Sequence, residues 1–206
     1  MYATTAQITT ELIGEVERNQ LVICEAPNGC GKTIAMCAAL IKLLLSDTYL
    51  PPNAETCHAL VLCPNNDSAY FIYKIFLQLC ANTVLTGTLV MPKHVTTNTA
   101  MSSLVNVNIV VAPLTIFSVF NERHLPSELT TIKFIVLTDC FRTVGAWLEY
   151  SHIFKQISHE TVKIIGLTAK LNAVSKDMCH SICELLAGSE SSLCTKVLFR
   201  LFLFDS

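Results

Sequence analysis

Charged side chains are scarce in this sequence, and its few cations do not gather into a basic run. Asp, Glu, Lys and Arg together make up 15% of the 206 residues, and the formal net charge is -2. Proteins that hold nucleic acid mainly by electrostatics are usually basic, so this composition argues against a freestanding nucleic-acid binder. Hydrophobic residues make up 51%, which is too many for a disordered chain and indicates a buried sheet.

The sequence also lacks a membrane-spanning run and a secretory leader. Polar or charged residues interrupt every apolar stretch before it reaches the length of a span. The first five residues have neither the positive start nor the hydrophobic region of a signal peptide. We therefore expect a cytoplasmic protein without membrane contact, whose ten cysteines stay reduced and mostly pack as small hydrophobes.

Residues with the spacing of metal ligands are nearly absent from the sequence. Cys179 and Cys183, with His180 beside the first of them, lie one helical turn apart and are the best candidates. A structural metal site needs a second pair of ligands, and none follows nearby in the sequence. We therefore do not predict a bound structural metal from these residues.

A glycine-rich segment between two apolar runs carries the clearest chemical signal. Residues 21–24 are short enough for a buried strand, and residues 34–45 form a longer run rich in helix formers. Between them, residues 26–33 read A-P-N-G-C-G-K-T. A strand, a glycine loop and a helix in this order are the context of a P-loop, whose amides and helix N-terminus bind phosphate.

Each residue of this loop has an expected role. Lys32 would reach the β- and γ-phosphates of ATP, and the Thr33 hydroxyl would hold Mg²⁺. The backbone N–H groups expected to face phosphate oxygens belong to Asn28, Gly29, Cys30 and Gly31. The strict P-loop pattern begins with glycine where this chain has Ala26, so a chance glycine-rich turn is the alternative interpretation.

The other apolar runs alternate with helical segments and predict one α/β domain over residues 1–206. Strands are expected at 59–63, 83–90, 108–113, 134–137, 163–169 and 197–204, and helices at 6–18, 69–81, 114–120 and 176–186. Continuous apolar strands alternating with helices predict a mostly parallel sheet with helices on both faces. The P-loop, Thr138–Asp139 and Thr168–Ala169 would all follow carboxyl ends of strands, where ligands bind in such sheets.

Three motifs, in this order, resemble the first RecA-like lobe of the Dicer and RNA-sensor helicases of superfamily 2. Residues 26–33 resemble the P-loop A-x-T-G-S-G-K-T, residues 134–141 (F-I-V-L-T-D-C-F) resemble V-F-D-E-C-H of motif II, and residues 164–172 (I-I-G-L-T-A-K-L-N) resemble L-G-L-T-A-S of motif III. The resemblance covers nearly the whole chain. It implies a RecA-like P-loop NTPase fold, ATP with Mg²⁺ as cofactors, and double-stranded RNA or hairpin RNA precursors as partners.

Motif II departs from the family pattern. Aligned with D-E-C-H, Thr138 replaces the Asp that orients Mg²⁺, Asp139 replaces the Glu that positions the attacking water, and Phe141 replaces His. A threonine hydroxyl is neutral and cannot supply the charge that neutralises the metal. Asp139 remains the one candidate catalytic residue, but its arm is a methylene shorter than that of Glu. Hydrolysis is therefore expected to be weak or absent.

Three more residues take their expected roles from the resemblance. Gln7 precedes the first strand, where a glutamine in such helicases often contacts the edge of adenine; the alternative is an exposed residue at a helix start. Thr168 and Ala169 match the T-A of motif III, which couples the nucleotide to RNA handling, or they simply end a strand.

Three functions remain open. The first is the helicase ATP-binding lobe of a Dicer-like endoribonuclease in small-RNA processing, partnered by a second RecA-like lobe and further Dicer modules if the chain is a fragment. The second is a pseudo-helicase scaffold in an RNA-processing complex that binds no nucleotide. The third is an unrelated P-loop kinase or transporter ATPase, which Ala26 and the L-T-A segment disfavour. Because superfamily 2 hydrolysis needs an arginine finger from a second lobe, the chain alone is expected neither to unwind nor to cut RNA.

Overall fold

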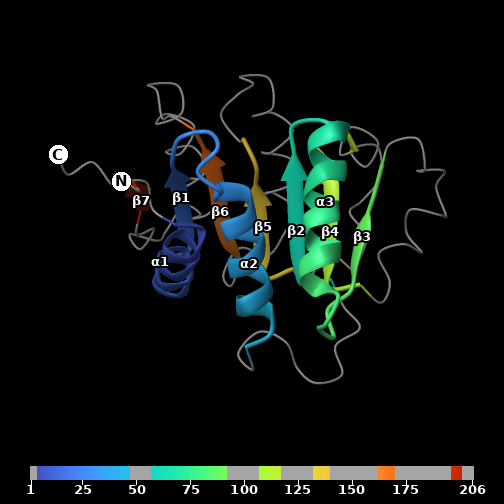
Figure 1. Ribbon diagram of the computed structural model, residues 1–206, viewed down its shortest axis with the longest axis horizontal. Helices are drawn as coiled ribbons and strands as arrows, with labels where there is room; N and C mark the ends of the chain where they lie inside the picture. Colours follow the sequence, from blue (N-terminus) through green and yellow to red (C-terminus); the bar gives the residue numbers. More distant parts are fainter. Residues whose placement is uncertain are drawn as a thin grey trace, which may run out of the picture.

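Seven parallel strands form one sheet in the part of the chain that the structure describes, in the order β3-β4-β2-β5-β6-β1-β7 (Figure 1). The structure is a computed structural model and describes residues 4–46, 57–91, 107–116, 132–139, 162–169 and the backbone of 196–200. The strands are β1 (Leu21–Glu25), β2 (Ala59–Cys63), β3 (Gly87–Leu89), β4 (Ile109–Pro113), β5 (Phe134–Leu137), β6 (Lys163–Thr168) and β7 (Lys196–Arg200). This confirms the predicted α/β fold and its parallel sheet.

Three helices cover one face of this sheet. They are α1 (Thr5–Arg18), α2 (Lys32–Leu44) and α3 (Asn66–Cys80), and their buried residues share one hydrophobic cluster with alternate residues of the strands. Figure 1 shows α2 and α3 in front of the sheet, roughly parallel to the strands, with α1 near the lower part of β1. The strand residues that point to the opposite face are buried as well, as expected of a sheet covered on both sides: Ile23, Leu60, Leu62, Val110, Ile135, Leu137 and Ile164.

Two predicted helices cannot be compared with the structure in full. The segment predicted at 114–120 is described only to Ile116, and the one at 176–186, with Cys179, His180 and Cys183, lies outside the described residues. None of the described helices is both long enough and apolar enough to cross a bilayer.

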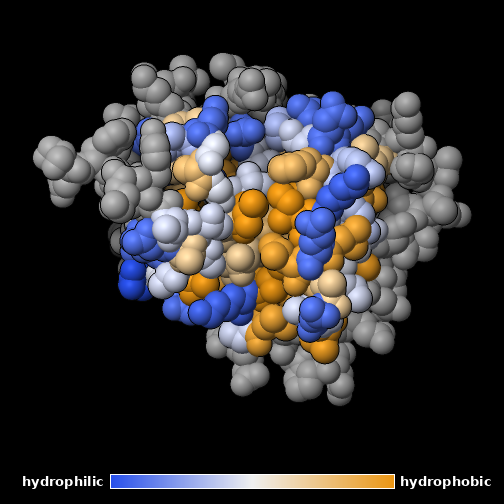
Figure 2. Space-filling model, in the orientation of Figure 1, coloured by the Kyte–Doolittle hydropathy of each residue, from blue (hydrophilic) through white to orange (hydrophobic). Residues whose placement is uncertain are grey.

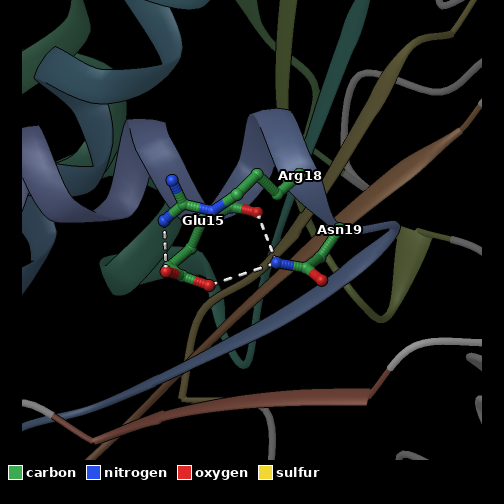
Figure 3. Close-up of polar contacts among 3 residues, drawn as sticks. All are labelled: Glu15, Arg18 and Asn19. Atoms are coloured by element: carbon green, nitrogen blue, oxygen red, sulfur yellow. Dashed lines mark hydrogen bonds and ion pairs between the residues drawn. The ribbon is translucent and has the colours of Figure 1, made fainter.

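The N-terminal helix shows why the sequence forms it. Ile8, Leu12 and Val16 recur every four residues and bury one stripe of α1 against the cluster. At its other end, Glu15 binds Arg18 on the surface, and the Asn19 side chain donates to the Glu15 carbonyl at 2.9 Å (Figure 3). The surface ion pair adds little stability because water screens it, whereas the Asn19 amide bonds a carbonyl in the helix's last turn.

Lys163, the first residue of β6, also holds the C-terminal end of α1. Its Nζ donates to the carbonyls of Val16, Glu17 and Asn19 at 2.7, 3.0 and 3.3 Å.

Replacing Lys163 with Met keeps the apolar stem but removes a charged donor from these carbonyls, so we expect a loss of about 1–3 kcal/mol in the free energy of unfolding. Urea denaturation measures it. Lys133→Met, at the half-buried residue before β5, is the control, and an equal loss there would contradict this role of Lys163.

Two element boundaries differ from the prediction because polar side chains accept hydrogen bonds from the backbone at these places. The Asn65 side chain accepts from the Ser68 N–H at 2.9 Å, so α3 begins at Asn66, three residues before the predicted start. The predicted strand 83–90 narrows to β3, because Asn108 Oδ1 accepts from the Thr86 N–H at 2.9 Å just before the ladder begins.

Hydrophobic side chains also gather on the outer surface of α2 and α3, as Figure 2 shows for the face seen in Figure 1. Among the described residues, all exposed large hydrophobic residues belong to these helices or to the turns that follow them: Ile34, Leu45, Tyr70, Phe71, Leu77, Leu79 and Val84. Helix α3 therefore carries large apolar residues on both its buried side and its outer side.

Candidate phosphate-binding site

The loop between β1 and α2 has the backbone conformation of an anion-binding loop. Gly29 and Gly31 have φ angles of 81° and 89°, in the left-handed region that residues with a Cβ rarely adopt. Gly31 is the N-cap of α2 and has no side chain to bind the first N–H groups of the helix. Among the described hydrogen bonds, none is donated by the backbone of residues 28–32. These amides are therefore open to a ligand.

Lys32 is a buried cation without a carboxylate partner among the described residues. It exposes 9% of its surface, and its Nζ donates to the Pro27 carbonyl at 2.7 Å. In the same part of the chain the one ion pair joins Arg18 and Glu15. A buried ammonium bound only to a neutral carbonyl gains most from a nearby anion, because charge-assisted hydrogen bonds are stronger than neutral ones.

The three predicted motifs follow the carboxyl ends of their strands, at the top of the sheet in Figure 1. Strand β6 lies between β1 and β5, so the loop, Thr168–Ala169 and Thr138–Asp139 follow three neighbouring strands. The Ala26 N–H donates to the Thr168 carbonyl at 3.1 Å, which ties the start of the loop to the end of β6. Neighbouring strands lie about 4.8 Å apart, so β1 and β5 are separated by about 10 Å.

Thr138 faces the neighbouring strand β2. It exposes 5% of its surface, and both its hydroxyl and its backbone N–H donate to the Leu62 carbonyl, at 3.1 and 3.0 Å. Cys63 lies beside it, and burial raises the pKa of the Cys63 thiol to about 12, against a smaller lowering by the Thr138 hydroxyl. The thiol and the hydroxyl are therefore both neutral at physiological pH.

Asp139 is the one described residue other than glycine with a positive φ angle, at 48°. Aspartate tolerates this left-handed conformation better than most residues, but it still costs the backbone about 1–2 kcal/mol. Asp139 is half-buried directly after Thr138. Its assignment as the catalytic carboxylate stays a prediction.

The residues at this edge do not fit the magnesium ion that the family resemblance implies. Mg²⁺ in nucleotide sites is held by one or two carboxylates in a strict octahedral arrangement. The position expected to supply the first carboxylate carries Thr138, whose hydroxyl hydrogen is already donated to Leu62. The described residues also contain no group of three His, Cys, Asp or Glu that could hold a metal ion. Thr33 as a magnesium ligand stays a prediction that this donor set does not support.

Gln7 occupies a capping box at the start of α1. Its Oε1 accepts from the Thr4 N–H at 2.8 Å, and its own N–H donates to Thr4 Oγ1 at 3.3 Å. The pattern T-x-x-Q in the sequence is the signal of this arrangement, and it was missed. Gln7 is exposed, which matches the alternative interpretation of this residue, while its contact with adenine stays a prediction.

The first turn of α1 nevertheless lies against the loop. A Cβ placed on Gly31 would stand 2.5 Å from Thr5 Oγ1. Sequence reasoning missed Thr5, because no motif links residues 26 positions apart. Of the other loop residues, Asn28 is exposed and Cys30 is half-buried against the core. Cys140 and Phe141 of the motif II segment lie outside the described residues.

Comparisons with known proteins agree with this geometry. The family model described as DEAD/DEAH box helicase matches residues 6–178. Among solved structures, a DEAD box protein from the hyperthermophile Methanococcus jannaschii has a TM-score of 0.68 at 19% identity, over 85% of this chain and 46% of that one. A variant of Dbp5 from S. cerevisiae, bound to RNA and ADP BeF3, has a TM-score of 0.65 at 16% identity, over 88% and 48%.

These structural likenesses show the fold alone, since the identities are low. The chain spans less than half the length of either protein. A comparison with curated proteins gives no significant match.

Proposed function

The chain belongs to the DEAD/DEAH box helicase family as a RecA-like, ATP-binding lobe, and on that premise we propose that it binds ATP with little or no turnover. The buried Lys32 ammonium, which meets only the Pro27 carbonyl, carries this proposal. A phosphate oxygen would replace that carbonyl and pair the cation with an anion. The family match also removes the alternative of an unrelated P-loop kinase or transporter ATPase.

The residues of this chain account for binding better than for hydrolysis. The open amides of the loop and Lys32 would hold and orient the phosphates. Turnover also needs a carboxylate that positions water and charge that stabilises the transition state. Thr138 is neutral, and Asp139 is a short carboxylate on a left-handed turn. Weak or absent hydrolysis follows from these two residues.

The wider role that we propose is the helicase lobe of a Dicer-like endoribonuclease in small-RNA processing. The motif III segment, residues 164–172, supports this assignment by its resemblance to Dicer. Its partners would be double-stranded RNA or hairpin RNA precursors, in the cytoplasm, together with a second RecA-like lobe and further Dicer modules. Because the chain spans less than half of the solved helicase structures, any unwinding would require those additional parts.

Replacing Lys32 with alanine tests nucleotide binding directly. A lost charge-assisted hydrogen bond to phosphate corresponds to about 1.5–3 kcal/mol, so we expect the dissociation constant of a fluorescent ATP analogue to rise about 10- to 150-fold. Fluorescence anisotropy measures it, with competition by inorganic tripolyphosphate showing that the phosphates are bound. Lys42→Ala is the matched control, because Lys42 is an exposed lysine in the last turn of the same helix.

The same experiment decides between the two remaining functions. The neutral Thr138 hydroxyl, engaged with Leu62, favours a pseudo-helicase scaffold that makes protein contacts in an RNA-processing complex and binds no nucleotide. If the wild-type chain binds no analogue, or if Lys32→Ala binds it equally well, the scaffold is the better description.

A further inference from the structure

We propose that this site takes its nucleoside triphosphate as the free polyphosphate anion, without Mg²⁺, and that Thr138 is the residue that determines this preference. The inference rests on the proposed nucleotide binding and concerns the ionic form of the ligand. It starts from two features of the site. The phosphate loop holds Lys32, a cation without an anionic partner among the described residues, whereas the end of β5 carries the neutral Thr138 where the family has the metal-binding acid.

The first step is the position of the Thr138 oxygen. Its hydroxyl donates to the Leu62 carbonyl, which also accepts the Thr138 N–H, so one side-chain bond and one backbone bond hold Thr138 against β2. With 5% of its surface exposed, Thr138 offers little area to a hydrated ion. Mg²⁺ keeps several of its waters in nucleotide sites and would need room beside this oxygen.

The second step is the charge around Thr138. The Cys63 thiol next to it is protonated, and Asp139 is the one carboxylate that immediately follows it in the chain. Groups of three potential ligands are absent from the described residues. A single half-buried carboxylate does not replace the arrangement that holds Mg²⁺ against the β- and γ-phosphates.

The third step is that positive charge is already present on the other side of the site. Lys32 is a buried cation without an anionic partner among the described residues, and it stands at the uncapped N-terminus of α2. Both attract negative charge, and the attraction grows with the charge of the ligand. Complexation with Mg²⁺ lowers the negative charge of ATP by two units and so weakens this attraction. Because the position expected to carry the metal-binding acid is the neutral Thr138, the free anion is the better ligand.

The ionic form of the ligand can be varied in one titration series. A fluorescent ATP analogue is titrated into the full chain in excess EDTA and in excess Mg²⁺. For the wild type we expect a lower dissociation constant in EDTA than in Mg²⁺, because the free anion carries more negative charge. For Thr138→Asp we expect binding at least tenfold tighter in Mg²⁺ than in EDTA, because the new carboxylate repels the free anion and holds the metal. Thr138→Asn introduces a side chain of the same size as Asp but without its charge, so its dissociation constants in EDTA and in Mg²⁺ should follow those of the wild type.

The outcomes separate this inference from the proposed function. If the wild type binds the analogue in Mg²⁺ as tightly as in EDTA, or more tightly, nucleotide binding stands and the preference for the free anion is overturned. If it binds the analogue in neither solution, both are overturned. The same two wild-type titrations decide the inference even where the carboxylate variant does not fold. Equal magnesium responses of the Asp and Asn variants would show that Thr138 does not set the preference.

Discussion

Gly31→Ala is expected to lower the free energy of unfolding by about 2–4 kcal/mol and to abolish phosphate binding. Two effects add. A residue with a Cβ at φ 89° costs about 1–2 kcal/mol, and the new Cβ would meet Thr5 Oγ1 at 2.5 Å, which forces α1 and the loop apart. Denaturation with urea measures the first result, and titration with the fluorescent ATP analogue measures the second.

Gly29→Ala is the matched control for this prediction. Gly29 has a similar φ angle of 81°, but nothing lies within 4 Å of the Cβ it would gain, so only the backbone cost of about 1–2 kcal/mol is expected. In a Thr5→Ala background the Oγ1 atom is gone, and Gly31→Ala should then cost about as much as Gly29→Ala. Equal costs of the two glycine variants in the wild-type background would show that α1 does not support the loop.

Phe76→Ala is expected to cost about 3–5 kcal/mol, a large share of the 5–15 kcal/mol by which a domain of this size is stable. Phe76 exposes 1% of its surface and packs α3 into the hydrophobic cluster. Truncation removes its burial and leaves a cavity that the sheet cannot fill, since the strands below are held by their ladders. The midpoint of urea unfolding should fall accordingly.

The same helix supplies the control. Phe71 lies five residues earlier in α3 and exposes 60% of its surface, so Phe71→Ala makes the same chemical change without a cavity. Its effect should stay within about 0.5 kcal/mol, as for most surface substitutions. A comparable loss at both positions would mean that the outer face of α3 is covered in solution.

The central strands were predictable because burial on both faces leaves a plain pattern. Strands β2 and β5 have the predicted bounds, and β1, β4 and β6 agree within one residue. Short apolar runs ending in proline or a polar residue leave few alternatives. The predicted strand at 197–204 begins as expected in β7, and its end lies outside the described residues.

The starts of the helices and the bounds of the edge strand β3 were harder to predict, because single polar side chains determine them. Several polar residues precede the predicted start of α3, and nothing in the sequence says whether Asn65 or a later one accepts the first N–H. At the edge, the side chain of Asn108 binds the Thr86 N–H across 22 residues. Contacts between distant residues leave no local pattern.

The residues of the candidate site could be predicted from the sequence, but the contacts between them could not. Lys32 and the glycines were assigned from the loop pattern, and the motif II substitution from the resemblance. The contact of Thr5 with Gly31 and the bond of Thr138 to the Leu62 carbonyl depend on how elements pack, which a motif does not encode.

Contacts at both ends of α1 indicate where the smallest folding unit begins. Its first turn touches the loop through Thr5, and its last turn is held by Lys163 from the far end of the sheet. A polypeptide trimmed to start at the first strand would keep the P-loop and motifs II and III and still lose the Thr5 contact that supports the glycine loop. The Ala35 N–H, which donates to the Gly31 carbonyl, should exchange with deuterium faster there than in the intact chain, so the helix before the P-loop belongs to the smallest competent unit.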